Sequence, residues 1–260
     1  ELLLRDFVQN NSYVTLTDTL DYLDDLGVNA IELMPVSNFD GNISWGYNPN
    51  FHMALDKAYG PPEDLKQFVE AAHQRGIAVI LDVVYNHATN QSPLVQMYGT
   101  SDENPWLNVP ASSPFSVFNQ LNHASPFVKE YIDRANTYWL EEFNVDGFRF
   151  DLSKGFISGQ PTNPNGYQQQ RINNIQRIAD HIWDNVDSEA YVILEHFGVP
   201  EEEQALSSYR ANDTGGMMLW NNMNEPYSQM SMGFGEGSDI AGTYYENRGL
   251  SNPNYVTYME

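Results

Sequence analysis

An arginine and an aspartate stand two residues apart in a short apolar stretch, residues 147–154, which reads GFRFDLSK. Because residues alternate sides along a strand, Arg149 and Asp151 are expected to project from one face, with Phe148, Phe150 and Leu152 on the other. A guanidinium beside a buried carboxyl group favours the anion and lowers its pKa. An ionised carboxylate is what a carboxylate nucleophile requires. The same spacing also suits a structural ion pair at a strand end, so the motif alone leaves both interpretations open.

Polar side chains recur where predicted strands end. Three consecutive strands carry them: Asp82, Asn86 and His87 close the first, Arg149, Asp151 and Lys154 the second, and Glu195 and His196 the third. A single acidic strand end is usually a helix cap or a solvated turn. Three in succession are hard to explain by capping, because parallel strands in one barrel present their carboxyl ends to a shared surface. The repetition favours a functional site.

The elements that must position these residues alternate in type along the chain. Helical spacing of apolar residues predicts helices near 15–26, 61–76, 125–143 and 172–182. Apolar runs predict strands at 1–7, 30–36, 77–84, 147–152, 191–194, 216–220 and 255–259. Strands that alternate with helices indicate βαβ units and a parallel sheet. The nearly continuous apolar run 77–84 is typical of a strand buried on both faces.

Two connections exceed ordinary loop lengths, residues 37–60 and 88–124, and a shorter one covers 155–165. Long loops in compact domains are usually functional. All three follow predicted strands, so in a barrel they would lie on the carboxyl-terminal face, where active sites are built. The loops and the polar strand ends therefore point to the same face.

Composition limits the possible partners. The chain has 260 residues and 41% hydrophobic content, which suits one large domain. With 35 acidic against 12 basic residues the formal charge is −23, which repels phosphate backbones and argues against a nucleic-acid partner. No apolar run approaches the length of a membrane span. The absence of cysteine excludes disulfides and thiolate metal sites. It is compatible with export, and we expect an extracytoplasmic or secreted protein whose signal peptide lies outside this sequence.

Several of these motifs together resemble those of the α-amylase family of retaining glycoside hydrolases. Segment 82–87 (DVVYNH) resembles the family's first signature, 147–154 its second, and the acid in 194–197 (LEHF) its third. Segments 46–49 (GYNP) and 121–123 (LNH) resemble a loop that supplies a stacking tyrosine and a weaker signature. Leu194 departs from the small residue often found before the acid.

The resemblance implies a (β/α)8 TIM-barrel catalytic domain across residues 1–260, with about seven strands present. Residues 88–124 would be an inserted loop region after the third strand, equivalent to a reduced domain B, although short for one. We expect the polypeptide to continue beyond Glu260 with a His-Asp pair and an eighth strand, because an open sheet leaves its edge strands unpaired.

The resemblance also implies roles for residues. Asp151 would be the nucleophile and Glu195 the general acid/base, while Asp82 would orient Arg149. The substrate-binding residues would be Tyr47, Trp45, Asp82, His87, Arg149, Lys154 and His196. A retaining glycosidase needs one ionised and one protonated carboxyl group, and their surroundings must separate the two pKa values. The apolar residues before Glu195, with Phe197 after it, could favour its neutral form.

Some residues keep two interpretations. Trp45 and Tyr47 either pack a loop or form an aromatic platform for a sugar, and His196 is either a neutral core histidine or a subsite contact. Asn86 corresponds to a calcium ligand in many relatives, yet a strand-end asparagine often satisfies backbone groups. The chemistry itself requires no cofactor, and a structural calcium ion would be held by Asn86.

The favoured function is hydrolysis of α-glucosidic bonds in starch or glycogen by double displacement, most simply endo-α-1,4 cleavage. Segment 44–49 (SWGYNP) also resembles loops of debranching and branching enzymes. An interpretation from another class is a non-catalytic glucan-binding barrel or a barrel subunit of a transporter. The presence of both Asp151 and Glu195 argues against it, because binding alone needs no pair of carboxyl groups in opposite protonation states.

Overall fold

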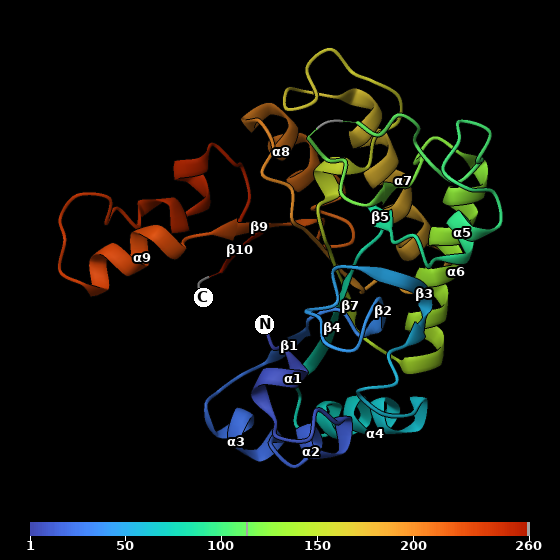
Figure 1. Ribbon diagram of the computed structural model, residues 1–260. Helices are drawn as coiled ribbons and strands as arrows, with labels where there is room; N and C mark the ends of the chain where they lie inside the picture. The colour runs from blue at the N-terminus through green and yellow to red at the C-terminus, as the bar shows by residue number, and fades with distance from the viewer. Residues whose placement is uncertain (113, 259–260) are drawn as a thin grey trace.

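The computed structural model describes residues 1–112 and 114–258, and its centre is a sheet of six parallel strands (Figure 1). The strands are β1 (Ala30–Leu33), β4 (Ala78–Val83), β7 (Gly147–Phe150), β8 (Tyr191–Leu194), β9 (Met218–Asn222) and β10 (Tyr255–Tyr258). Each pairs in parallel with the next in that order. Spatial order therefore equals chain order, as in consecutive strands of a (β/α)8 barrel, and the predicted fold class is confirmed.

Helices alternate with the strands along the chain. The longer ones are α4 (Pro62–His73), α6 (Pro126–Phe143), α7 (Gln169–Asn185), α8 (Pro200–Ser207) and α9 (Asn224–Ser231). Helix α6 starts with a proline at its first position and ends at Asn144, which is left-handed with φ 55°. Its apolar stripe, which includes Val128, Ile132 and Trp139, is fully buried. Helices α4, α6 and α7 lie together on one side of the sheet, whereas the segment with α9 extends away from the rest (Figure 1).

The amino-terminal segment differs from its prediction. Only Leu2 pairs with the sheet, through a parallel bridge to Leu33, and helix α1 (Leu4–Phe7) follows directly. The sheet therefore has six strands where about seven were predicted. In the segment 1–7 the apolar residues are consecutive and do not alternate, so burial of Leu4 in a helical turn satisfies them equally well.

The helix predicted over 15–26 is two short helices, α2 (Tyr13–Thr17) and α3 (Leu20–Asp25). The hydroxyl groups of Thr17 and Thr19 donate to the carbonyl groups of Tyr13 and Leu16. Such local side-chain bonds compete with continuous helical bonding, which accounts for the break.

The two long connections contain structure of their own. In the first, β2 (Ser37–Phe39) and β3 (Pro49–Leu55) form an antiparallel pair. In the second, β5 (His87–Ala88) pairs with β6 (Asn119–Gln120), and α5 (Pro93–Gln96) lies between them. Further on are the 3₁₀ turns η1 (Ser153–Gly155), η2 (Ala241–Thr243) and η3 (Tyr245–Arg248). Among the described residues, no helix combines the length and apolar character that crossing a membrane requires.

Strand β7 owes its position to a glycine. Gly147 has φ +149°, and a Cβ atom there would lie 2.3 Å from the carbonyl oxygen of Tyr191. Only glycine therefore allows β7 to approach β8 this closely. As predicted, Phe148 and Phe150 are buried in the core. Leu152 lies beyond the strand, left-handed at φ 45° and half-buried, so the predicted alternation stops at Asp151.

Candidate active site

The carboxyl ends of the strands surround a pocket of about 750 Å³. Its principal lining residues are Glu32, Trp45, Tyr47, Arg149, Asp151, Glu195, Phe197, Trp220 and Tyr258. Glu32 lies on the edge strand β1 and Tyr258 on the opposite edge strand β10, so the sheet curves far enough for both edges to border one space. The strand ends singled out in the sequence therefore meet.

Arg149 is the centre of the polar contacts in this pocket. Its Nη1 atom donates to both carboxylate oxygens of Asp82, at 3.0 Å each, and to Oδ1 of Asp151 at 3.1 Å. Its Nη2 atom lies 3.5 Å from Oε2 of Glu195. The parallel register places Arg149 directly opposite Asp82 on the adjacent strand. One guanidinium thus contacts all three carboxyl groups.

Arg149 lowers the pKa of Asp151 as predicted, but the net shift of that pKa is upward. Burial raises the pKa of Asp151 well above its ordinary value, the charge of Asp82 raises it further, and Arg149 opposes the rise without cancelling it. Burial likewise raises the pKa of Asp82 to about 6, against the attraction of Arg149. Because one cation is shared among several carboxyl groups, it cannot stabilise all of them as anions at once.

Glu195 is held in more polar surroundings than its apolar sequence neighbours suggested. Its Oε2 atom accepts a hydrogen bond of 2.7 Å from the backbone N–H of Leu152, in addition to the contact with Arg149. Its side chain is about one fifth exposed (20%) and borders the pocket. The carboxyl group therefore has a fixed direction and access to the space where a substrate would lie.

Two aromatic residues come from the loop after β1. The hydroxyl group of Tyr47 donates to Oδ2 of Asp82 at 2.7 Å, and its ring borders the pocket. Trp45 borders the same pocket and is 61% exposed. Gly46 between them packs against Pro35 at a position where a Cβ atom would clash at 2.6 Å. An exposed indole at a pocket rim suits stacking better than loop packing.

Four predicted substrate contacts lie outside the pocket lining: Asp82, His87, Lys154 and His196. Asp82 is buried and bonds to Tyr47 and Arg149, which do line the pocket. His87 is buried, with Nε2 2.8 Å from the carbonyl oxygen of Tyr47 and the ring of Phe118 against it. Lys154 donates to the carbonyl oxygen of Phe197. His196 is fully buried and points away, because successive residues after β8 project to opposite sides and Glu195 takes the pocket side.

Comparison with known proteins shows similarity to one family. The model of the α-amylase catalytic domain matches residues 13–108. Malto-oligosyltrehalose trehalohydrolase of Saccharolobus solfataricus is 35% identical over 162 residues, which is 62% of this chain and 28% of that protein. Over these segments the chain resembles members of the α-amylase family. Isoamylase SU1 of Zea mays is 33% identical over 192 residues, covering 61% of this chain and 24% of that protein.

The fold of the chain also matches a solved structure. Amy13B of Eubacterium rectale superposes with a TM-score of 0.70 at 21% identity, over 95% of this chain and 52% of that one. The chain spans about a quarter of the length of the curated relatives above. The matched family segment 13–108 includes Tyr47 and Asp82 and ends before Asp151 and Glu195.

Asn86 bears on the calcium site that the resemblance to the α-amylase family implies. Its Nδ2 atom donates to the carbonyl oxygen of Phe115, while its buried Oδ1 atom has no hydrogen-bond partner in the described part of the chain. An unpartnered buried oxygen suits a hard cation. Within the described residues, three acidic or histidine side chains approach one another closely enough to share a metal only at Glu1, Glu32 and Asp82. At Asn86 the residues thus fit one ligand of a calcium ion.

The pocket lining also includes residues that the sequence did not single out for the site, among them Glu32, Phe197, Trp220 and Tyr258. The ring of Trp220 lies 4.4 Å from the Arg149 guanidinium and stacks on Tyr258 at 3.9 Å. Burial and the charge of Asp82 raise the pKa of Glu32 to about 8. Two features of the sequence could have indicated these residues. Glu32 is a carboxyl group inside the apolar run 30–36, and Trp220 ends the predicted strand 216–220.

Proposed function

We propose that the protein hydrolyses α-glucosidic bonds in starch- or glycogen-type glucans with retention of anomeric configuration. The observation that carries this proposal is the contact of a single guanidinium, Arg149, with both Asp151 and Glu195 at the edge of one pocket. Retaining glycosidases place two carboxyl groups close together on either side of the bond that is cleaved. The similarity to the α-amylase catalytic domain supports the same assignment.

In this mechanism the carboxylate of Asp151 attacks the anomeric carbon while Glu195 donates a proton to the departing oxygen. The C–O bond of the leaving sugar breaks, and a bond from the anomeric carbon to Asp151 forms. Glu195, now ionised, then removes a proton from water, which displaces Asp151 and restores both groups. The hydrogen bond from Leu152 N–H to Oε2 fixes the direction of the Glu195 carboxyl group.

The neighbouring acids regulate the charge that Asp151 experiences. With a pKa of about 8, Glu32 keeps its proton at neutral pH and adds little negative charge. The hydroxyl group of Tyr47 donates a hydrogen bond to the carboxylate of Asp82. This hydrogen bond stabilises part of the negative charge of Asp82. More of the positive charge of Arg149 is then available to Asp151. The raised pKa of Asp151 implies that activity rises with pH as this group loses its proton.

The aromatic residues around the pocket suit the apolar faces of glucose units. Trp45 is exposed at the rim, and Tyr47 and Trp220 border the interior. Flat rings offer large contact area to C–H groups while the sugar hydroxyl groups face polar side chains. A neutral sugar also avoids the repulsion that an anionic ligand would meet in a protein with a charge of −23.

Endo-α-1,4 cleavage is the simplest specificity within this proposal. The similarity to Isoamylase SU1 favours a debranching specificity as the second candidate. The similarity to malto-oligosyltrehalose trehalohydrolases adds a maltooligosaccharide linked to trehalose as a substrate to test. We also propose that a structural calcium ion, bound in part by Oδ1 of Asn86, supports the loop after β4.

The test uses the full-length protein with linear maltooligosaccharides, amylopectin, pullulan and malto-oligosyltrehalose. An endo-α-1,4 enzyme shortens the linear substrates, whereas a debranching enzyme releases linear chains from amylopectin and leaves maltooligosaccharides intact. Proton NMR of the first products should show the α-anomer before mutarotation. First release of the β-anomer would contradict retention. Glucan binding without any turnover would favour the non-catalytic alternative.

A further inference from the structure

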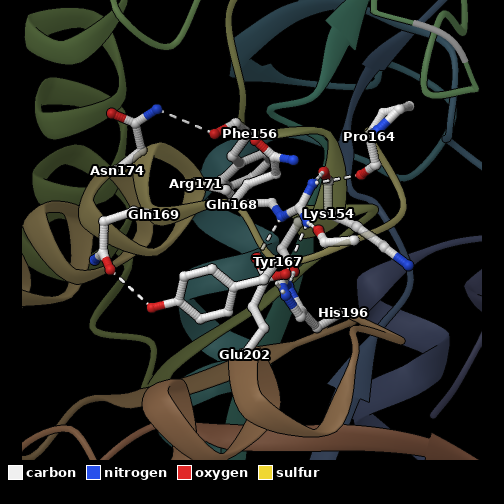
Figure 2. A network of polar contacts seen from close by, with 12 residues as sticks. Lys154, Phe156, Pro164, Tyr167, Gln168, Gln169, Arg171, Asn174, His196 and Glu202 are labelled. Atoms are coloured by element: carbon white, nitrogen blue, oxygen red, sulfur yellow. Dashed lines mark hydrogen bonds and ion pairs between the residues drawn. The ribbon is translucent and has the colours of Figure 1, made fainter. Parts of the chain in front are cut away.

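A second buried charged cluster lies outside the pocket lining, where Arg171 of α7 meets Glu202 of α8 (Figure 2). Both side chains are fully buried, with Nε to Oε1 at 2.6 Å and Nη2 to Oε2 at 2.8 Å. The remaining guanidinium hydrogens go to the carbonyl oxygens of Lys154, Pro164 and Gly166. All five N–H donors of Arg171 are therefore used, and the loop after β7 is tied to both helices.

His196 connects this pair with the turn beside Glu195. Its Nε2 atom lies 3.4 Å from Oε1 of Glu202, and its Nδ1 atom lies 3.0 Å from the hydroxyl oxygen of Ser153. The Ser153 hydroxyl is also 2.9 Å from the backbone carbonyl oxygen of Glu195, which accepts the backbone N–H of Ser153 at 3.0 Å. A continuous path of contacts thus leads from Arg171 to the backbone of Glu195.

The position of the imidazole proton of His196 decides which atoms donate and which accept along this path. Burial lowers the pKa of His196, although Glu202 opposes the change, so the imidazole is neutral and carries one proton. A lone pair on Nε2 would face the carboxylate of Glu202, so the proton belongs on Nε2. The Ser153 hydroxyl donates to the Glu195 carbonyl oxygen and faces Nδ1 of His196 as a second acceptor, while the N–H of Ser153 also donates to that carbonyl oxygen. The Arg171–Glu202 pair therefore selects the tautomer of His196.

The turn that this path holds also connects the two proposed catalytic carboxyl groups. Leu152 lies between Asp151 and Ser153 and is left-handed at φ 45°, a conformation that costs a non-glycine residue about 1–3 kcal/mol. Its N–H donates to Oε2 of Glu195. Such a conformation persists only where the surrounding contacts fix it, and the bonds of Ser153 to Glu195 and His196 are those contacts.

We define the positioning relay as four residues: Arg171, Glu202, His196 and Ser153. We propose that the positioning relay fixes the backbone of Glu195 and thereby aims its carboxyl group at the leaving oxygen. This inference rests on the proposed function, in which Glu195 is the general acid/base. The relay residues touch no substrate and act through Glu195. A misplacement of about 1 Å in a proton donor is enough to lower a rate by about two orders of magnitude.

The test compares two substrates that differ in their need for a proton donor. A maltooligosaccharide needs protonation of its leaving oxygen, whereas α-maltosyl fluoride releases fluoride ion without it. In the full-length protein, Ser153→Ala should lower kcat/KM for the maltooligosaccharide about 10- to 100-fold. It should lower kcat/KM for the fluoride by less than about threefold, because that constant reports only steps up to departure of fluoride.

The control is Ser207→Ala, since Ser207 is as buried as Ser153 but, among the described residues, its hydroxyl bonds only to the Gln204 carbonyl within α8. Ser207→Ala should leave kcat/KM unchanged for both substrates. Gly198→Ala is the second variant, because a Cβ atom there would lie 2.7 Å from Cδ2 of His196 and displace the imidazole. It should reproduce the difference between substrates even if Ser153→Ala does not fold.

Glu195→Gln provides the reference. It should show the largest difference between the loss of kcat/KM on the maltooligosaccharide and the loss on the fluoride. If it shows that difference while Ser153→Ala and Gly198→Ala lower both constants equally or not at all, the relay is only structural and the inference is wrong. If the unmodified protein cleaves neither substrate, the proposed function is wrong, and the inference about the positioning relay is wrong as well. The two failures are therefore distinguished by the unmodified protein.

Discussion

Two buried charged clusters of this protein differ in their balance of carboxyl groups and cations. The pocket cluster has four carboxyl groups and one guanidinium: Glu32, Asp82, Asp151, Glu195 and Arg149. In the positioning relay, one guanidinium faces one carboxylate in a sealed environment. Both arginines are almost completely buried, so the difference is one of charge balance and not of depth.

The imbalance determines how the carboxyl groups bind protons. Burial raises the pKa values of Glu32 and Asp82 to about 8 and about 6. Burial alone would also raise the pKa of Glu202, but the hydrogen bonds from Arg171 and His196 outweigh it and lower the pKa. A matched pair therefore stabilises an anion and fixes geometry, whereas an excess of acids keeps carboxyl groups poised between protonation states.

The largest expected effect comes from removing the nucleophile of the pocket cluster. Asp151→Asn should lower kcat/KM on maltooligosaccharides by about 10⁴ or more, because an amide cannot attack the anomeric carbon. The free energy of unfolding should not fall, since the variant removes one acid from an overcrowded cluster. Asp213→Asn, at an exposed aspartate, is the matched control. Turnover above a tenth of the unmodified rate would remove Asp151 from the mechanism.

Replacing each arginine should separate the two clusters by stability. Arg171→Met leaves Glu202 buried without its cation and should lower the free energy of unfolding by about 3–5 kcal/mol. Arg149→Met should abolish turnover but cost less stability, because the neighbouring acids with raised pKa values take up protons. Denaturant unfolding at pH 7 measures both. A larger loss for Arg149→Met would reverse the comparison.

The raised pKa values in the pocket cluster should make the stability of the protein depend on pH. A folded-state pKa above the unfolded value means that the folded state binds more protons, so stability falls as pH rises through that window. For Glu32 the window runs from its ordinary value of 4.5 to about 8. Each group contributes a slope of up to about 1.4 kcal/mol per pH unit. Glu32→Gln should make the decline shallower, and an unchanged slope would contradict the assignment.

Calcium should have the smallest effect. If Asn86 supplies one ligand, adding the ion to chelator-treated protein should raise Tm by about 2–4 °C, which corresponds to roughly 1 kcal/mol for a domain of this size. Asn86→Ala should remove the calcium-dependent part of Tm and leave the rest. A calcium response of equal size in both proteins would place the ion elsewhere.

The sequence by itself determined the order and type of most elements, because periodicity is a local property of the chain. The strand 191–194 is found at those residues, and helix α4 lies within the predicted 61–76. It also determined that Arg149 and Asp151 meet, since a spacing of two residues places both on one side. Local signals were insufficient for the segment 1–7, where an apolar run fits a helical turn as well as a strand.

Only the tertiary structure decided which charges share the pocket. Glu32 and Arg149 are far apart in the chain, and their common environment arises from the curvature of the sheet. The pKa direction of Asp151 depends on burial and on Asp82, neither of which a two-residue spacing reveals. The side of β8 to which His196 turns, and its contact with Glu202, depend on how α8 packs. Electrostatics and burial are sums over neighbours in space, so they are fixed only when the chain has folded.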